Sequence, residues 1–78
     1  MRKIQLRFFG QFSDRIPQNP TNFLCQGNSF EALKKEMIEK YDFLKDVPFQ
    51  LAQNQKIGND NELLEEAEVA VFPPFSGG

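Results

Sequence analysis

Glu68-Val69-Ala70-Val71-Phe72-Pro73-Pro74-Phe75-Ser76-Gly77-Gly78 closes the sequence and divides into two parts. Residues 69–72 form a short apolar run rich in strand-forming side chains, which predicts a buried strand. Pro73 and Pro74 follow directly, and because proline has no N–H donor they cannot continue a sheet ladder. Their rings also hold φ near the polyproline value, so we expect the chain to leave the sheet extended.

The segment from Pro73 onward is predicted to be a tail, residues 73–78, attached to a domain of residues 1–72. At roughly 3.3–3.6 Å per residue such a tail reaches at most about 20 Å from the domain. Gly77 and Gly78 carry no Cβ, so this end can enter a slot too narrow for a side chain. A frayed terminus is the ordinary alternative. The stiff Pro-Pro stem favours instead a carboxylate on which another protein performs chemistry.

Composition limits the classes of function. The chain is short enough for one domain, and its net charge of −2 comes from charges of both signs spread along the sequence. A basic face for nucleic acid and an apolar run of membrane-spanning length are both missing from the sequence. The N-terminus alternates like a strand and does not resemble a signal peptide. The single Cys25 fits a reducing compartment, so we expect a cytoplasmic protein.

Catalytic groups are scarce. The sequence has no His, which excludes His-based triads and His-containing metal sites. One Cys cannot build a zinc or iron–sulfur site, and no Gly-rich phosphate-binding motif is present. We expect Glu65, Glu66 and Glu68 to face solvent and not to bind a metal. The sequence therefore predicts a chain that is not an enzyme by itself, with no metal and no stably bound cofactor.

Strand patterns occur at both ends of the chain. Residues 2–9 alternate, with Ile4, Leu6 and Phe8 on the buried side. Phe9 falls on the polar side by parity, unless a bulge near Gly10 turns it inward, and both interpretations stay open. Further strands are expected over residues 21–26, 49–53 and 69–72, with a short one beginning at residues 56–57.

The connections between these strands include one helix. It begins with Asn28 or Ser29 as the N-cap. Its apolar stripe comprises Phe30, Leu33, Met37 and Tyr41, with Ile38 beside it. The pairs Glu31–Lys35 and Glu36–Lys40 are interpreted as a solvated helix face.

The other connections carry turn residues. Residues 10–20 are expected to be a loop, and Asn54-Gln55 a tight turn. Leu63 and Leu64 are expected to fill the core. Whether Cys25 or Leu24 faces the core is left open; Cys25 is interpreted as a small buried thiol and not as a nucleophile.

One helix cannot cover both faces of a sheet of four or five strands, so we expect an α+β fold with one open face. If Val69 and Val71 point to the helix, then Phe72 points away and shares the open face with Phe9. Phe75 lies just beyond on the tail. Exposed aromatic side chains grouped beside a reactive end indicate an interface.

Four segments resemble a known family, and together they span the chain: Leu6–Gln11, Ser29–Leu33, Ala52–Gln55 and, above all, Glu68–Gly78. They are similar to the small subunit of molybdopterin synthase, a ubiquitin-like sulfur carrier. The resemblance implies a β-grasp fold, in which a mixed four- or five-stranded sheet packs on one main helix. The chain departs from this family where Glu65-Glu66-Ala67 replaces a common Asp-Gly-Asp turn. It also has Ser13 where an Arg that contacts the partner is often found.

The resemblance also implies a function for the tail. A ubiquitin-activating-like adenylyltransferase would adenylate Gly78 with ATP, and a sulfur donor would convert it to a thiocarboxylate. Gly77 would let the tail thread into the large catalytic subunit, which would receive sulfur for cyclic pyranopterin monophosphate in molybdenum cofactor biosynthesis. The implied partner-binding residues are Phe9, Phe72, Pro73, Pro74, Phe75 and Ser76, and the implied assembly is a heterotetramer of two small and two large subunits. Two alternatives stay open: a sulfur carrier for thiamine or cysteine synthesis, or a protein modifier conjugated through Gly78.

Overall fold

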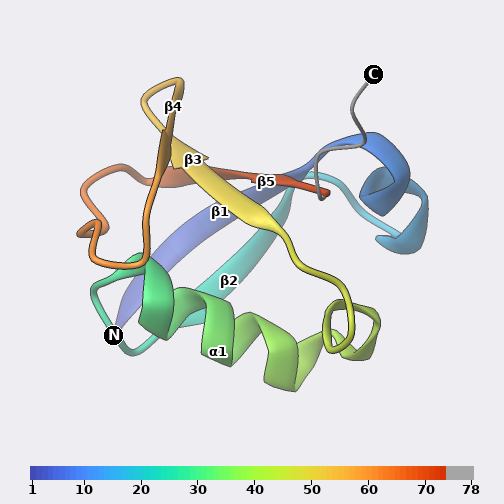
Figure 1. The fold of residues 1–78 in the computed structure, drawn as a ribbon, viewed down its shortest axis with the longest axis horizontal. Helices are drawn as coiled ribbons and strands as arrows, with labels where there is room; N and C mark the ends of the chain where they lie inside the picture. The colour runs from blue at the N-terminus through green and yellow to red at the C-terminus, as the bar shows by residue number, and fades with distance from the viewer. Residues whose placement is uncertain (74–78) are drawn as a thin grey trace.

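The computed structural model describes residues 1–73 of the chain, which alternate between strands and short helices. The elements in order are β1 (Arg2–Phe8), the 3-10 helix η1 (Gly10–Arg15), β2 (Thr21–Cys25), α1 (Phe30–Lys40), the 3-10 turn η2 (Asp42–Leu44), β3 (Gln50–Gln53), β4 (Lys56–Gly58) and β5 (Glu68–Phe72). In Figure 1 the helix α1 lies across one side of the sheet, and within residues 1–73 no α-helix covers the other side.

The strands form one five-stranded sheet in the order β2-β1-β5-β3-β4. β1 and β5 are parallel, whereas β1 pairs with β2, and β3 with β4 and β5, in antiparallel fashion. β5, the last strand in the sequence, therefore lies in the middle of the sheet, between β1 and β3 (Figure 1). This is the predicted α+β, β-grasp arrangement, in its five-stranded form.

The core lies between the sheet and α1, and strand parity explains it. Ile4, Leu6 and Phe8 are buried on the helix side of β1, as their alternation predicts. The parallel register places Leu6 beside Val69 and Phe8 beside Val71, so the two central strands bury the same face.

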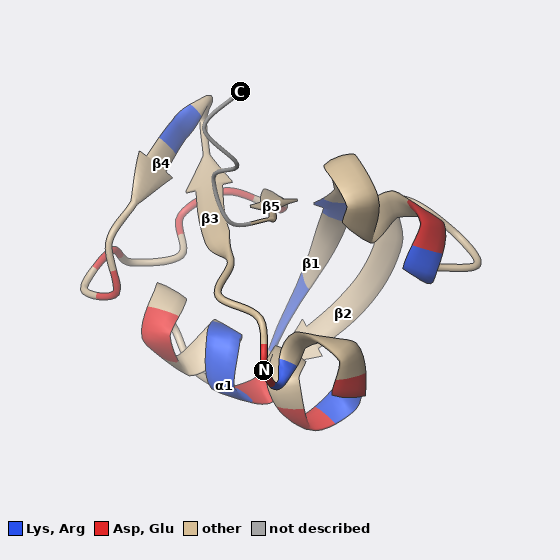
Figure 2. Cartoon of the chain, turned by 45° about the vertical axis from the view of Figure 1, so that its right-hand side comes forward, with Lys and Arg blue, Asp and Glu red and all other residues tan. Residues whose placement is uncertain are grey.

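The helix α1 begins and packs as its sequence predicts. Ser29 is the N-cap, and its Oγ accepts a hydrogen bond from the N–H of Ala32 at 3.2 Å, which resolves the choice between Asn28 and Ser29. Phe30, Leu33 and Met37 are fully buried. Figure 2 shows basic and acidic residues interspersed along α1.

The charged pairs of α1 behave differently from the prediction. Glu36 does not pair with Lys40; its carboxylate accepts backbone N–H bonds from Gln26 at 2.9 Å and Gly27 at 3.0 Å. These bonds lower the pKa of Glu36, and the bond from Gln26 has the largest effect. Lys40 instead lies over the rings of Phe23 and Tyr41. The i,i+4 rule was wrong here because it considers one helix and not the β2–α1 loop packed beside it.

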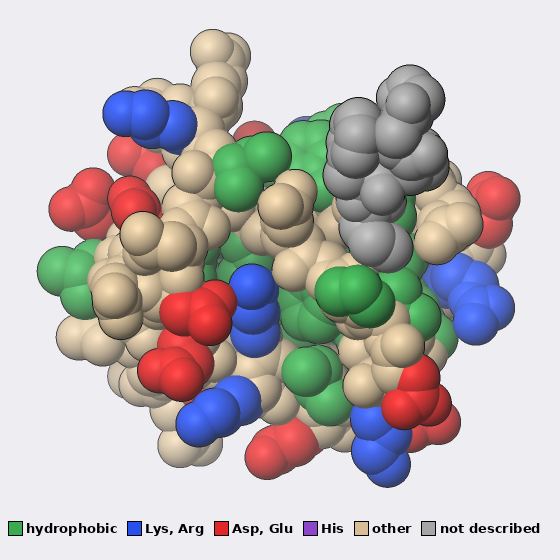
Figure 3. Space-filling view, viewed as in Figure 1, with side chains coloured by type: hydrophobic (Ala, Val, Ile, Leu, Met, Phe, Trp, Pro, Cys, Tyr) green, Lys and Arg blue, Asp and Glu red, His purple; other side chains and the backbone are tan. Residues whose placement is uncertain are grey.

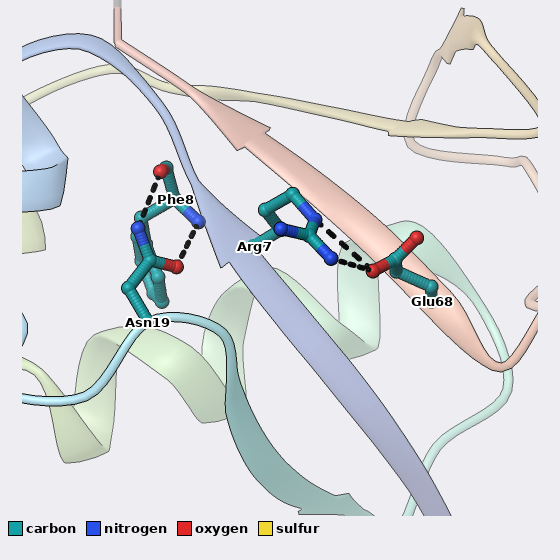
Figure 4. Close-up of polar contacts among 4 residues, drawn as sticks. All are labelled: Arg7, Phe8, Asn19 and Glu68. Carbon is teal, nitrogen blue, oxygen red and sulfur yellow. Dashed lines mark hydrogen bonds and ion pairs between the residues drawn. The ribbon is translucent and has the colours of Figure 1, made fainter.

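Residues 10–20, predicted to be a loop, contain the 3-10 helix η1 and bury Phe12 and Ile16 in the core. The side-chain amide of Asn19 binds both backbone groups of Phe8, accepting from its N–H at 2.9 Å and donating to its carbonyl at 2.8 Å (Figure 4). Asn19 thus replaces a neighbouring strand at the end of β1 and holds the segment against the sheet.

Two neighbouring leucines were predicted to be core residues, and one prediction was wrong. Leu64 is 3% exposed, but Leu63 is 55% exposed. The buried amide of Gln53 holds this segment: it donates to the Leu63 carbonyl at 2.6 Å and accepts from the N–H groups of Glu65 at 3.0 Å and Glu66 at 3.2 Å. These bonds stabilise the turn at Glu65-Glu66-Ala67, which lacks the glycine of the Asp-Gly-Asp turn common in the resembling family.

The end of β2 settles the alternative left open for its side chains. Cys25 is fully buried and Leu24 is 60% exposed, so the thiol faces the core as a small buried group. Within residues 1–73, no helix is long and apolar enough to cross a membrane.

Candidate functional site: the open face and the tail root

The open face of the sheet is formed by the alternate residues of the core-forming strands. On β5, Val69 and Val71 are fully buried toward α1, while Ala70 and Phe72 are partly exposed on the other side. This confirms the predicted parity of β5. Because β5 is central, its outward side chains lie in the middle of the open face.

Phe9 also lies on this face. Its backbone is extended, with φ −119° and ψ 165°, and its N–H donates to the Val71 carbonyl at 3.0 Å. Its ring stacks on that of Phe72, with centroids 4.9 Å apart and planes 11° from parallel. Phe9 is 38% exposed, so parity decides its orientation and the inward-turned alternative is excluded. We call Phe9, Phe72 and Pro73 the tail root, since the remaining tail follows them.

A hollow of roughly 470 Å³ lies beside the tail root. Its apolar lining comes from Phe9, Ala52, Ile57, Ala70 and Phe72. An aromatic stack next to an apolar hollow is the form of surface that receives side chains of a protein partner. The hairpin turn that borders it, Asn54-Gln55, has positive φ at both residues, 54° and 63°, as a tight turn between antiparallel strands requires.

Arg7 and Glu68 form an ion pair in the same hollow (Figure 4). The guanidinium donates to one carboxylate oxygen from Nε at 3.1 Å and from Nη2 at 2.9 Å. Both side chains are about half exposed, so the pair contributes little to stability. Its two charges offset each other, so the pair adds polar groups to the lining of the hollow without a net charge. In the space-filling view, charges of both signs are dispersed over the visible surface (Figure 3).

The tail root contacts the β1–η1 junction. Gly10 has φ +61°, and a Cβ placed on it would lie 2.8 Å from Cγ of Pro73. Pro73 therefore lies directly against the glycine backbone. Two neighbouring contacts, Phe9 with Phe72 and Gly10 with Pro73, hold the chain where it leaves β5.

The predicted site residues fall into two groups. Phe9, Phe72 and Pro73 are brought together at the tail root. Pro74, Phe75, Ser76, Gly77 and Gly78 lie outside the described residues. The sequence reasoning missed the hollow itself. Strand parity could have placed Arg7 and Ala70 on the open face, but their pairing and the contribution of Ile57 depend on the order and register of the strands in the sheet.

The other candidate groups lie apart from this face. The Cys25 thiol is buried 3.4 Å from the Gly27 carbonyl oxygen and 3.5 Å from Oε2 of Glu36. Burial, followed by the charge of Glu36, raises the pKa of this thiol, so it is a poor nucleophile. Ser13, at the position where the resembling family often has Arg, donates its hydroxyl to the Gly10 carbonyl at 2.8 Å. Within residues 1–73 there is no group of three or more Cys, Asp or Glu that could hold a metal ion.

Comparison with known proteins agrees with the fold described above. The sequence model of the ThiS family matches residues 6–78. No curated protein sequence matches the chain significantly. Among solved structures, one assigned as molybdopterin converting factor, subunit 1, from Pyrococcus furiosus is similar, with a TM-score of 0.80 and 20% identity over 96% of this chain and 100% of that one. SAMP1 from Haloferax volcanii is also similar, with a TM-score of 0.75 and 15% identity over 97% and 99% of the two chains. At these identities the two structures establish the fold alone.

Proposed function

Because this chain belongs to the ThiS family, which comprises ubiquitin-like sulfur carriers, we propose that it is the sulfur-donor subunit of a molybdopterin synthase. In this proposal it carries sulfur as a thiocarboxylate on Gly78. It delivers that sulfur to cyclic pyranopterin monophosphate, which is bound by a large catalytic subunit. The Phe-Pro-Pro ending before the terminal glycines supports this pathway over thiamine synthesis, whose carriers usually lack Pro-Pro there.

The position of β5 is the observation that carries the proposal. β5, the strand that leads to the tail, lies at the centre of the sheet, and its own side chains Val69 and Val71 are fully buried. Phe72 and Pro73 are held by Phe9 and Gly10 where the chain leaves the sheet. A terminal carboxylate on a root held in this way can be presented to a partner while the domain itself docks through the neighbouring hollow.

The chemistry follows from what a carboxylate lacks. A carboxylate is a poor electrophile, so a ubiquitin-activating-like adenylyltransferase would first join Gly78 to the adenylate of ATP and release pyrophosphate. A sulfur donor then displaces AMP from the acyl carbon and leaves a thiocarboxylate, whose sulfur is the nucleophile in the next step. As the family resemblance implies, the large subunit would supply the acid–base groups. This chain would supply the nucleophile and its placement.

The open face would bind both partners. Phe9 and Phe72 provide the aromatic centre and the hollow provides a pocket for a partner side chain, while the Arg7–Glu68 pair presents polar groups beside them. In the proposed assembly two such chains bind two large subunits through this face, forming a heterotetramer. No metal is required on this chain, and ATP is used only at the activating enzyme.

The proposal is tested by sulfur transfer in a reconstituted reaction. The thiocarboxylated chain is mixed with the large subunit and cyclic pyranopterin monophosphate, and the dithiolene product is measured. Replacing Gly77 by Val, or adding one Ala after Gly78 before activation, should abolish transfer without unfolding the domain, because the tail no longer fits a glycine-wide slot. Adding one Ala before Met1 is the matched control and should leave transfer unchanged.

Other outcomes would redirect the proposal. Product formation by the chain extended past Gly78 would contradict it. Discovery of Gly78 in isopeptide linkage to lysines of other proteins would move the function to a ubiquitin-like modifier. Transfer to a thiamine or cysteine precursor, with none to the pyranopterin, would keep the carrier chemistry and change its pathway.

A further inference from the structure

We propose that Gly10 is a positioning residue that sets the direction in which the C-terminal tail leaves the domain, through its contact with Pro73. The inference rests on the proposed function, since direction matters because the tail must reach a second protein. It adds a residue outside the tail to the set that controls sulfur delivery. Gly10 acts through Pro73 and touches no reacting atom in this account.

Gly10 has no room for a side chain where it faces Pro73. Its φ of +61° is a conformation that L side chains rarely adopt. A Cβ at this position would lie 2.8 Å from Cγ and 3.2 Å from Cδ of Pro73. Both distances are shorter than carbon–carbon contacts of about 3.5–4.0 Å at optimal separation. The ring of Pro73 is cyclised onto its own backbone, so it cannot swing aside like a flexible side chain. One of the two backbones must therefore move when position 10 gains a methyl group.

The backbone at Gly10 is held more firmly than the backbone at Pro73. Gly10 begins η1, and η1 is fixed to the domain by the buried ring of Phe12. Ser13 binds the Gly10 carbonyl at 2.8 Å, and Phe9 binds the Val71 carbonyl at 3.0 Å through its N–H. Gly10 is thus held from both sides, whereas Pro73 follows the last residue of β5. We infer that Pro73 is displaced and Gly10 stays in place.

A displacement of Pro73 would change the position of the Gly78 carboxylate. The Pro73 ring fixes its own φ, and a residue that precedes proline is restricted to extended conformations. The Pro73-Pro74 pair therefore transmits a change of direction better than an ordinary dipeptide, which could rotate to cancel it. In positioned reactions a misplacement of about 1 Å can cost roughly 10²-fold in rate. A small shift at the tail root is enough to affect transfer.

The test compares the two enantiomers of alanine at position 10 and uses a variant in another loop as the control for loss of stability. The Gly10→Ala variant has the methyl group that meets Pro73. A synthetic chain with D-alanine at position 10 accepts positive φ and places its methyl at the other Cα hydrogen. Gly27→Ala is the control for destabilisation, because Gly27 lies in the β2–α1 loop and its added Cβ would clash with Cβ of Ala32 in α1. Each chain is prepared as the thiocarboxylate by chemical ligation, which bypasses the activating enzyme.

Sulfur transfer is then measured in a single turnover, with the large subunit at saturating concentration. We expect Gly10→Ala to lower the rate by about 10–10²-fold while its affinity for the large subunit changes less than about threefold. The D-alanine chain should recover most of the lost rate, and folded Gly27→Ala should transfer at the wild-type rate. Equal slowing by both enantiomers, slowing by Gly27→Ala, or a normal rate in Gly10→Ala would each overturn the inference.

A second measurement on the chain alone distinguishes failure of this inference from failure of the proposed function. Nuclear Overhauser effects between the α-protons of Gly10 and the ring protons of Pro73 report their contact directly. We expect them in the wild type and a shifted Pro73 spin system in Gly10→Ala. Unchanged Pro73 signals in that variant would overturn the positioning role even if sulfur transfer is established. Absence of transfer in the wild type, with this contact present, would contradict only the proposed function.

Discussion

The two faces of the central sheet are built from alternate residues of the same strands, yet they differ in almost every physical respect. On the helix side, Phe8 is 2% exposed and packs edge-to-face against Tyr41 with ring centroids 5.6 Å apart. On the open side, its neighbour Phe9 is 38% exposed and stacks on Phe72 next to a hollow. Two consecutive phenylalanines thus serve different purposes, one the stability of the domain and the other its proposed recognition by partners.

This difference separates the residues that stabilise the fold from those that are proposed to bind a partner. The residues buried under α1 hold the sheet together, and the outward residues of β1 and β5 face away from that core. Because β5 takes part in both faces, the tail root is connected rigidly to the core through Val69 and Val71. Variants on the two faces test whether the core side determines stability and the open side determines binding.

Truncating the two phenylalanines separately gives the sharpest contrast. We expect Phe8→Ala to lower the free energy of unfolding by about 3–5 kcal/mol, because it leaves a cavity in the core. Phe9→Ala should cost less than about 1.5 kcal/mol, because it removes one ring stack at a partly exposed site. Urea denaturation of both variants measures the two values. Similar losses would mean that the faces do not divide stability from recognition.

The reciprocal experiment uses binding to the large subunit. We expect Phe72→Ala to weaken affinity by about 2 kcal/mol or more, close to 30-fold, because a central aromatic residue of an interface carries much of its energy. Leu24→Ala is the control, since Leu24 is 60% exposed but lies on β2, away from the tail root. Titration calorimetry measures both affinities. A large loss of thermal stability in Phe72→Ala with unchanged affinity would reverse the assignment of the faces.

Glu36→Gln tests a contact far from the open face. The pKa of Glu36 is lowered first by the backbone N–H of Gln26, so its contribution to stability is present above the ordinary carboxyl pKa. That contribution is lost as the pH falls through the lowered pKa of the folded state. We expect wild-type stability to fall more steeply below about pH 4.5 than that of Glu36→Gln, whose side chain does not titrate. Parallel pH profiles of the melting temperature would contradict this role, and binding at neutral pH should be the same for both.

The smallest effect is expected within the hollow. A double-mutant cycle with Arg7→Ala and Glu68→Ala should give a coupling energy of about 0.2–1 kcal/mol, because both side chains are half exposed. The coupling should shrink as salt is added. Chemical denaturation at two ionic strengths measures it. A coupling above about 2 kcal/mol would show that the open face contributes to stability like the core.

These results also show what the sequence could and could not predict. Alternation in β1 and β5 predicted the buried set and the outward orientation of Phe72, because parity is a local property of a strand. Strand parity alone leaves Phe9 undecided, because a bulge near Gly10 could interrupt the alternation. The hydrogen bond from the Phe9 N–H to the Val71 carbonyl, far along the chain, keeps the alternation through Phe9. Leu63 was misplaced for a related reason: in an irregular segment no periodicity tells two adjacent leucines apart.

The remaining errors come from contacts between segments. The turn residues of segment 10–20 predicted a loop, but the segment contains a 3-10 helix with Phe12 buried. Composition alone does not reveal its packing against the sheet. The i,i+4 rule assigned Glu36 to Lys40, whereas the Glu36 carboxylate accepts hydrogen bonds from two backbone N–H groups of the loop beside the helix. The hollow and the contact between Gly10 and Pro73 join residues from both ends of the chain and from the hairpin between them. Such sites emerge only when the topology is known.

The intact mass of the activated chain shows whether Gly78 carries sulfur. The full chain is incubated with its adenylyltransferase, Mg-ATP and a sulfide source, and the intact mass is determined before and after fragmentation. The account predicts exchange of one oxygen for sulfur, confined to Gly78 and dependent on ATP. An unchanged Gly78 while the enzyme consumes ATP in response to the chain, or sulfur found on Cys25 instead, would contradict it.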